Sequence, residues 1–253
     1  MQRTYTLLAV LWLARLFGAE TGGRQAPAYS PSSLVNAASN QSGALAPNTI
    51  ATLYGADLAY LTRGLVPDDI RDGLLPTQFP SVGVRVYVAG SPAPLYFVSP
   101  RQVNLLIPSN VLTGPTQLFL ALDGRAGPSI SITLVSQSPA LFLVDERNAV
   151  STRTGDIVTL YATGLGETVV PTRPGEIAKA ANRLARVDEF RLTLAGEQVP
   201  RSNILYVGLA PGFAGLYQIN FQLPAGTRPD PEIQIAIGDA QSPSGVVLPL
   251  KGQ

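Results

Sequence analysis

Apolar and polar side chains alternate with a period of two along much of the chain. In residues 217–223, four apolar side chains alternate with three amides, and residues 102–107 follow a similar pattern. This alternation predicts β-strands that bury one face and expose the other. The amides on the predicted solvent face are Gln102, Asn104, Gln218, Asn220 and Gln222.

Further short runs are rich in β-branched, leucine and aromatic residues. They span residues 82–88, 117–122, 130–134, 157–161, 190–194, 233–237 and 246–250. Gly, Pro, Asp and Ser separate them at intervals of roughly 8 to 15 residues, which is typical of antiparallel β-sandwiches. Only residues 176–186 have helical composition and spacing, so they predict one short helix within a loop. The predicted fold class is therefore all-β.

The chain also repeats itself. Residues 52–58 recur as 159–165 with an offset of 107, residues 88–90 recur as 194–196 with an offset of 106, and residues 102–108 recur as 218–224 with an offset of 116. Self-similarity over this distance predicts two copies of one module, with an insertion of roughly ten residues before the third match. We expect two tandem immunoglobulin-like β-sandwich modules, over residues 35–145 and 146–253. Residues 139–142 are expected to close the first core, which places the boundary near residues 145–153.

Residues 1–19 have the layout of a secretory signal peptide. The basic Arg3 precedes an apolar stretch of 11 residues at 4–14, and small residues suited to cleavage follow at 18–19. Eleven residues are too few to span a bilayer, which needs about 20. We predict export to the cell surface or the medium, a flexible lead-in over residues 20–34, and no membrane span in the mature chain. The alternative is an N-terminal helix docked on the body of the protein.

The amino-acid composition excludes several classes of active site and ligand. The 253 residues include no His and no Cys, which excludes Ser-His-Asp and Cys nucleophiles, His or thiolate metal sites, and disulfides. The formal net charge is +1, and cleavage after residue 19 would make it −1, so nucleic-acid binding has no electrostatic support. We expect no enzymatic activity and no organic cofactor. The remote enzymatic alternative is a carboxylate-dependent hydrolase, which would need a cleft that brings an acid from each copy together.

One loop has the composition of a possible metal site. Asp68, Asp69 and Asp72 lie in a segment bounded by Pro67 and Gly73. Three carboxylates supply the oxygen ligands that Ca²⁺ prefers, so calcium is a candidate ligand. The alternative is a solvated loop in which arginines pair with these acids.

The five outward amides form a candidate binding surface. They fall on the equivalent predicted strand of each copy, so they would make a polar ladder on one sheet face. The alternative is the ordinary polarity of a solvent-facing strand. Most Tyr and Phe residues fall at predicted inward positions, which favours core packing over a carbohydrate-stacking surface. A carbohydrate-binding module would need an exposed Tyr or amide patch.

A family resemblance rests on a series of short motifs. In the first copy they are Val35-Asn36-Ala37-Ala38-Ser39, Ala46-Pro47, Leu53-Tyr54-Gly55, Pro92-Ala93-Pro94-Leu95, Val98-Ser99-Pro100, Gln102-Val103-Asn104 and Ile107-Pro108, and in the second they are residues 160–166 and 208–220. Over about residues 33–250, the chain resembles the uncharacterised C-terminal domain family of acidobacterial (Solibacter-type) secreted proteins. Each half also resembles an IPT/TIG-type immunoglobulin-like module. The resemblance implies no catalytic residues.

These observations together predict a non-catalytic secreted or cell-surface module for interaction or adhesion. Its expected partner is an unknown protein or polysaccharide at the cell envelope. The alternative is a carbohydrate-binding accessory module, which shares the same fold and the same export signal.

Overall fold

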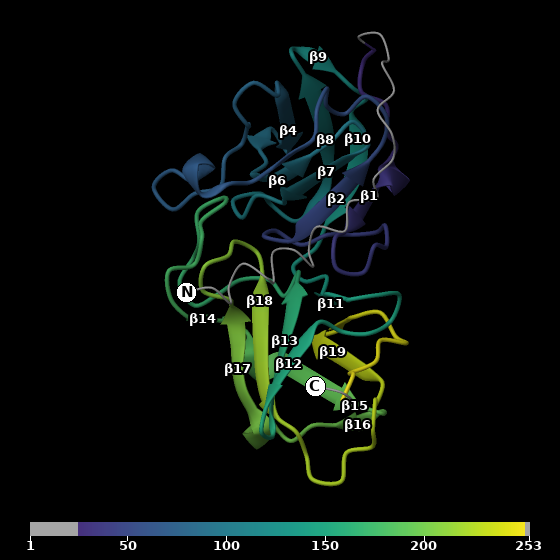
Figure 1. Ribbon diagram of the computed structural model, residues 1–253, viewed down its shortest axis with the longest axis vertical. Coiled ribbons are helices and arrows are strands. Elements are labelled where there is room, and N and C mark those ends of the chain that lie inside the picture. The colour runs from purple at the N-terminus through teal and green to yellow at the C-terminus, as the bar shows by residue number, and fades with distance from the viewer. Residues whose placement is uncertain (1–24, 251–253) are drawn as a thin grey trace.

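The computed structural model describes residues 25–250, so the predicted signal peptide lies outside the described residues. Four antiparallel sheets form two modules, and Figure 1 shows these modules stacked along the long axis of the molecule. The first module contains β1 to β10 and the second contains β11 to β20. Helical structure in residues 25–250 consists of the 3₁₀ turns η1 (Pro31–Ser33), η2 (Pro67–Asp69), η3 (Val187–Glu189) and η4 (Arg201–Asn203). The all-β prediction is confirmed.

Two sheets enclose the core of the first module. Sheet 1A has the order β1 (Leu34–Asn36), β2 (Ile50–Tyr54), β7 (Gln102–Leu106), β6 (Leu95–Val98) and β3 (Arg63–Gly64). Sheet 1B has the order β10 (Ile130–Leu134), β8 (Gly114–Leu122), β4 (Val84–Val88) and β5 (Ser91–Pro92), with β9 (Arg125–Ala126) also paired to β8.

The second module repeats most of this arrangement, with the additional strand β12 in one sheet and no equivalent of β10 in the other. Sheet 2A has the order β11 (Ala140–Leu141), β13 (Ile157–Thr163), β18 (Tyr217–Gln222), β17 (Ile204–Leu209) and β14 (Asn182–Arg183), with β12 (Ser151–Thr154) also paired to β13. Sheet 2B has the order β16 (Glu197–Gln198), β15 (Phe190–Leu194), β19 (Ile233–Ile237) and β20 (Ala240–Gln241).

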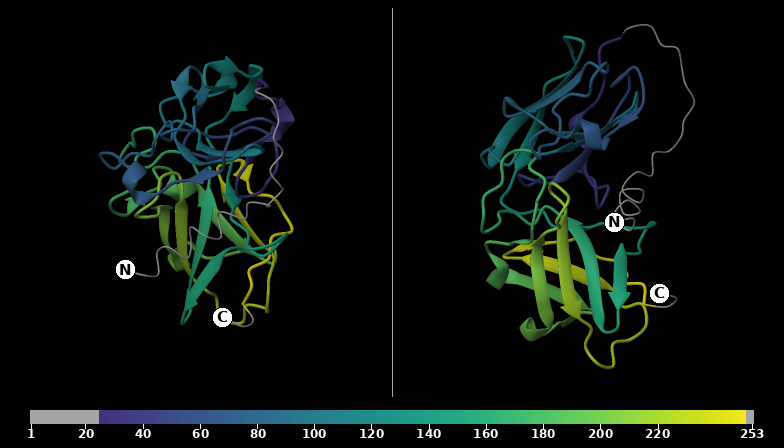
Figure 2. Two further views of the ribbon diagram at one scale, coloured as in Figure 1. Left: turned by 45° about the horizontal axis from the view of Figure 1, so that its top comes forward. Right: turned by 60° about the vertical axis from the view of Figure 1, so that its left-hand side comes forward.

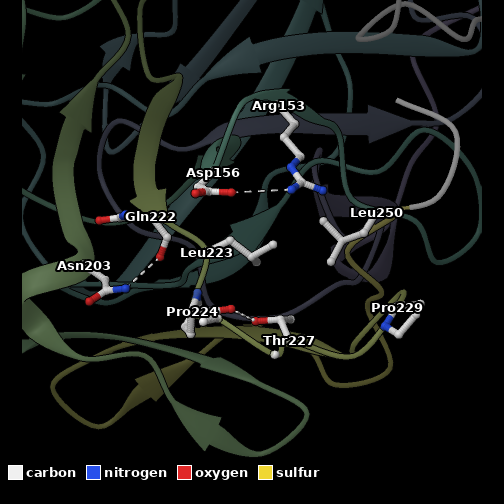
Figure 3. A pocket seen from close by; sticks show the side chains of 11 residues that line it. Arg153, Asp156, Asn203, Gln222, Leu223, Pro224, Thr227, Pro229 and Leu250 are labelled. Carbon is white, nitrogen blue, oxygen red and sulfur yellow. Dashed lines mark hydrogen bonds and ion pairs between the residues drawn. The ribbon is translucent and has the colours of Figure 1, made fainter.

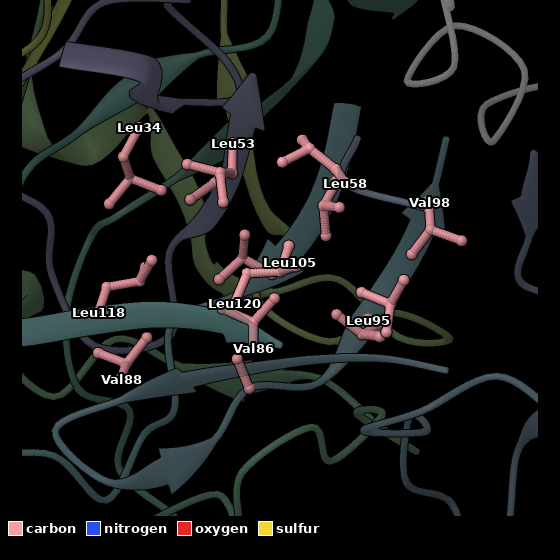
Figure 4. Close-up of a cluster of buried hydrophobic side chains, with 14 of the residues drawn as sticks. Leu34, Leu53, Leu58, Val86, Val88, Leu95, Val98, Leu105, Leu118 and Leu120 are labelled. Atoms are coloured by element: carbon pink, nitrogen blue, oxygen red, sulfur yellow. The ribbon is translucent and has the colours of Figure 1, made fainter. Parts of the chain in front are cut away.

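The inward side chains of each sheet pair fill a separate core. In the first module, Leu53 and Leu105 of sheet 1A meet Leu120 of sheet 1B, as Figure 4 shows, and all three are fully buried. Ile219 and Phe221 occupy the corresponding positions in the second core. Removing a side chain of this size from such a core costs about 2–5 kcal/mol. The period of two in the sequence therefore assigns the inward positions of β7 and β18 correctly.

The helix predicted over residues 176–186 is wrong. Residues Asn182–Arg183 form β14 on the edge of β17, and residues 175–177 reach the first module instead. There the Leu75 N–H donates to Gly175 O at 2.9 Å, and the Ile177 N–H donates to Gly73 O at 2.8 Å. A helix of about 11 residues is marginal by itself in water, so pairing with an open strand edge and with the neighbouring module prevails.

The first module also ends earlier than the sequence suggested. Strand β11 pairs with β13, and Leu141 packs in the second core, so residues 139–142 do not close the first one. Residues 246–250, predicted as a strand, form only isolated bridges from Val247 to Asn148 and Glu232. Pro249 interrupts this segment because it has no N–H to donate to a neighbouring strand.

A third apolar cluster joins the two modules. The first module contributes chiefly Ile50, Tyr96 and Leu106, and the second contributes chiefly Phe213, Ala214 and Leu216. Gly215 crosses this cluster with φ 64°, and a Cβ built there would lie 2.2 Å from Leu106 Cδ1. Only glycine fits this position, because both the left-handed backbone and the close approach exclude a side chain.

Buried hydrogen bonds fix the junction further. The Tyr96 hydroxyl donates to Ala214 O, and the Ile50 N–H donates to Thr163 Oγ1 at 2.9 Å. The Thr163 hydroxyl in turn donates to Gly215 O at 2.8 Å. Each of these buried groups would be costly to leave unpaired, so the contact defines one relative orientation of the modules. Figure 2 shows the resulting end-to-end arrangement in two further views.

Part of the insertion in the sequence repeat lies in the loop that makes this junction. Residues 99–101 join β6 to β7 in the first module, whereas residues 210–216 join the equivalent strands β17 and β18 in the second. The loop is seven residues long in the second module and three in the first, so it accounts for part of the rise in offset from 106 to 116, and it carries Phe213, Ala214 and Gly215.

Candidate functional site

The outward side chains of β13, β18 and β17 form one polar face of sheet 2A, which we call the amide face. Its members are Ile157, Thr159, Tyr161, Tyr206, Gln218, Asn220 and Gln222. Strand register arranges them in rows across the sheet: Tyr161 lies opposite Gln218, Thr159 lies opposite Asn220, and Asn220 lies opposite Tyr206. Figure 2 shows the three strands side by side at one surface of the second module.

A side-chain hydrogen bond links two of the predicted amides in each module. Gln218 Nε2 donates to Asn220 Oδ1 at 2.9 Å, and Gln102 Nε2 donates to Asn104 Oδ1 at 2.8 Å. This bond fixes the orientation of both side-chain amides, because it requires the nitrogen of the glutamine amide and the oxygen of the asparagine amide to face each other. In the second module, Gln218 Oε1 and Asn220 Nδ2 remain available to a ligand. The two copies of the sequence repeat therefore share the same Gln-to-Asn side-chain hydrogen bond.

Gln102 and Asn104 lie on sheet 1A rather than on the amide face. Asn104 is buried, and its Oδ1 also accepts a hydrogen bond from the Thr52 hydroxyl at 3.1 Å. The structure therefore brings the five predicted amides together as two separate groups, one in each module. Gln222 is exposed at the end of β18, farthest from the junction.

The ring of Tyr206 is fixed along the amide face. Its hydroxyl donates to Leu209 O at 2.7 Å and accepts from the Asn182 N–H at 3.0 Å. It also lies over Gly208, where a Cβ would be 2.7 Å from the hydroxyl oxygen and 2.2 Å from Asn182 O. The ring therefore runs parallel to β17, with one side against the sheet and the other toward solvent.

Asn182 is fixed in turn by the loop that precedes it. Its side-chain amide donates to Val170 O at 2.8 Å and to Thr168 Oγ1 at 3.0 Å, and its Oδ1 accepts from the Val170 N–H at 3.1 Å. This satisfied network holds the backbone N–H that binds Tyr206. The segment that the sequence predicted as helical thus positions an aromatic side chain.

Tyr161 lies on the other side of β18 from Tyr206. It is half-buried against the junction cluster, and burial raises the pKa of its hydroxyl. Among the described residues, that hydroxyl has no hydrogen-bond partner. The two tyrosines stand two strands apart, which corresponds to roughly 10 Å across the sheet. Gln218 and Asn220 occupy the strand between them.

The seven described residues that define the amide face are all uncharged. Two places at its border are charged: Arg183 on the edge strand β14 lies in the same row as Gly208 and Gln218, and Arg153 and Asp156 line a cavity together with Gln222. Burial raises the pKa of Tyr206, while the hydrogen bond from Asn182 and the charge of Arg183 lower it to a smaller extent. The face therefore offers amides, hydroxyls and aromatic rings, all neutral in ordinary buffers.

The three aspartates proposed for calcium do not form a metal site. Asp69 turns inward, where its carboxylate binds the Arg63 guanidinium at 2.7 Å and the Val66 N–H at 3.0 Å, whereas Asp68 and Asp72 are exposed. Within residues 25–250, no three acidic side chains are arranged to hold a metal ion. The Arg63 pairing that the sequence left as the alternative is the one observed.

A cavity of about 580 Å³ opens at the end of the second module away from the junction. Figure 3 shows Arg153, Asp156, Gln222 and Leu250 around it. The Arg153 and Asp156 side chains form an ion pair of 3.8 Å, and Leu223 and Leu250 give the cavity an apolar wall. It contains a single acid, so it lacks the paired carboxylates of a glycoside hydrolase.

Sequence reasoning missed Tyr206, Gly208 and Asn182. The sequence predicted no strand over residues 204–209, which form β17 with a bulge between Ile204 and Tyr206, so it placed Tyr206 on no sheet face. The usable signal was Gly208, because a glycine inside a strand often marks the close approach of another group.

No protein-family model and no curated protein sequence matches the chain. Among solved structures, SGBP-B of the Bacteroides ovatus mixed-linkage glucan utilization locus, in complex with a mixed-linkage heptasaccharide, is 10% identical with a TM-score of 0.33, and the match covers 90% of this chain and 43% of that one. The surface glycan-binding protein PbSGBP-B from Prevotella bryantii is 13% identical with a TM-score of 0.27, covering 87% of this chain and 41% of that one.

Domains 5–6 of the S-layer protein SbsC are 9% identical with a TM-score of 0.27, and this match covers 88% of the chain and 98% of those domains. The chain spans less than half the length of the two glycan-binding proteins. At TM-scores this low, similarity of architecture does not extend to function. The resemblance to acidobacterial secreted proteins stays a prediction.

Proposed function

We propose that the chain is a non-catalytic interaction module of the cell surface, and that it binds its partner through the amide face of the second module. The observation that carries this proposal is the fixed, uncharged and solvent-facing set formed by Tyr206, Gln218 and Asn220. Ordered side chains lose little conformational entropy on binding, so a surface of this kind favours recognition. The predicted signal peptide supports export, where such a surface would meet envelope components.

The test is retention of the purified chain on envelope fractions of the source cells. Thr159→Arg places a bulky charge in the middle of the amide face without removing a hydrogen bond that the structure contains. Gln198→Arg is the matched control, because Gln198 is exposed on β16 of the opposite sheet. We expect Thr159→Arg to abolish retention and Gln198→Arg to preserve it. Equal retention of both variants would refute the assignment of this face.

A carbohydrate polymer is favoured over a protein as the partner by one specific observation. Tyr161 and Tyr206 are half-buried on the outward face, so both offer ring surface outside the core. An exposed tyrosine and amide patch is the feature that distinguishes a carbohydrate-binding module from a sandwich whose aromatic side chains all pack inside.

A further inference from the structure

We propose that the ligand of the amide face is a neutral polysaccharide, which stacks on Tyr206 and Tyr161 and forms hydrogen bonds with Gln218 and Asn220 between them. This inference rests on the proposed function, because it names the ligand class of the same face. Three properties of the face support it: the absence of charged side chains among its seven members, the fixed ring of Tyr206, and the order of groups across the strands.

The hydrogen-bonding groups of the face match those of sugar hydroxyls. Each amide carries both a donor and an acceptor, and a sugar hydroxyl is itself both. With Gln218 Nε2 committed to Asn220 Oδ1, the pair presents Gln218 Oε1 as an acceptor and Asn220 Nδ2 as a donor. Strands β13, β18 and β17 carry no cation on this face to recognise phosphate, sulfate or uronate, and Arg183 flanks it from the edge strand β14, so we assign a neutral polymer and expect an acidic one to bind only through Arg183.

Tyr206 offers a ring face rather than a hydroxyl. Both hydrogen-bonding directions of its hydroxyl are used by Leu209 O and the Asn182 N–H, and Gly208 allows the ring to lie flat. The apolar C–H side of a sugar ring can stack on such a surface. Because the ring is already held in place, stacking costs little conformational entropy.

The order of groups suits a chain that crosses the strands. From β13 to β17, a polymer would meet Tyr161, then Gln218 and Asn220, then Tyr206. The Tyr161 hydroxyl is available for a hydrogen bond to the ligand, in contrast to the Tyr206 hydroxyl. The roughly 10 Å between the outer two strands exceeds one sugar ring, so the face recognises an oligomeric segment rather than a monosaccharide.

The experiment measures binding of the purified chain to neutral hexose and pentose polymers and to polygalacturonate, by affinity electrophoresis and then calorimetry. We expect saturable binding to at least one neutral polymer that persists in 0.5 M salt, since no ion pair is involved. Tyr206→Ala and Tyr161→Ala should each weaken binding by about tenfold or more. Tyr60→Ala is the control, because Tyr60 is exposed in the first module and should leave binding unchanged.

Tyr206→Phe provides a second variant that keeps the ring and removes both hydroxyl hydrogen bonds. We expect several-fold weaker binding with an unchanged fold by circular dichroism, because the ring remains but is no longer fixed. The ligand assignment would be overturned if neutral polymers bound equally well to Tyr206→Ala, Tyr161→Ala and Tyr206→Phe. It would also be overturned by salt-sensitive binding to polygalacturonate alone. Retention on envelope fractions that depends on Thr159 without any neutral-polymer binding would overturn only the ligand class. Loss of that dependence would overturn the proposed function itself.

Discussion

The two modules contain the same sheet and use it differently. In both, a Gln–Asn hydrogen bond lies beside a bulged strand, with the bulge between Leu95 and Phe97 in one copy and between Ile204 and Tyr206 in the other. The row formed by Ile50 and Leu106 is buried in the junction, whereas the equivalent row, Ile157 and Gln222, is exposed. One copy of the face therefore docks a neighbouring module, and the other remains open.

A single loop accounts for this difference. The β17–β18 loop, residues 210–216, is longer than its counterpart 99–101 in the first module, and it provides the surface that receives Ile50, Tyr96 and Leu106. The comparison teaches that an insertion in one copy of a repeat can assign different roles to two otherwise equivalent faces.

Gly215→Val should break the junction and give the largest effect. Its side chain would collide with Leu106 and with Asn48 O, 2.7 Å away, and would also require φ 64°. We expect a loss of about 3–5 kcal/mol in the free energy of unfolding and two separate unfolding transitions by calorimetry. The control is Gly212→Ala, where φ is 89° but no atom lies within 4 Å, so only about 1 kcal/mol should be lost. A single transition of unchanged midpoint in Gly215→Val would contradict the role of this loop.

Tyr96→Phe should weaken the same junction less. It leaves the buried Ala214 carbonyl without its donor, which costs about 1–3 kcal/mol. Chemical denaturation measures the loss. Tyr60→Phe, at a side chain that is 48% exposed, should stay within about 0.5 kcal/mol of the parent protein. Equal effects of the two substitutions would mean that the Tyr96 hydroxyl does not stabilise the contact.

Alkaline pH should destabilise the folded protein through buried tyrosines. Burial raises the pKa of Tyr96 and Tyr217 well above the ordinary value of 10.0, so the folded state keeps protons that the unfolded state releases. Their contribution is therefore complete below pH 10 and is lost as the pH rises toward the folded pKa, by up to about 1.4 kcal/mol per pH unit for each group. Denaturation series at pH 9 and pH 11 should show a smaller loss in Tyr96→Phe than in the parent protein.

Thr52→Val and Thr159→Val should change the free energy of unfolding by different amounts, and this difference between the two equivalent faces is the smallest of the expected effects. Thr52 donates to Asn104 in a buried setting, so its substitution should cost about 1 kcal/mol. Thr159 occupies the matching position but makes no side-chain hydrogen bond among the described residues, so Thr159→Val should be neutral within about 0.5 kcal/mol. Identical losses in the two variants, measured by urea unfolding, would show that the faces are energetically the same.

The sequence predicts regular strands well and local irregularities poorly. Alternation placed Ile219 and Phe221 inside and Gln218 and Asn220 outside, because burial on one face imposes a period of two. Tyr206 was missed because residues 204–209, which contain the bulge and Gly208, were not predicted as a strand. The helix predicted at residues 176–186 failed because its competitor, the open edge of β17, lies 20 or more residues away in the chain.

The calcium prediction failed for a related reason. Composition counts Asp68, Asp69 and Asp72 together, but only the folded chain shows that Asp69 binds Arg63, whose guanidinium also lies 4.9 Å from the centre of the Phe79 ring. Proximity in sequence therefore did not predict which charges meet.

The inserted loop also limits how far such modules can stack. Contact between two unlike ends of similar modules is a head-to-tail contact, which can extend into a filament when every copy carries both ends. Here the first module has only residues 99–101 where the receiving loop would be, and the second has Gln222 where the docking face has Leu106. The described residues at the two outer ends therefore lack the groups that make this junction, so a second copy of the chain could not be added to either end through the same contact.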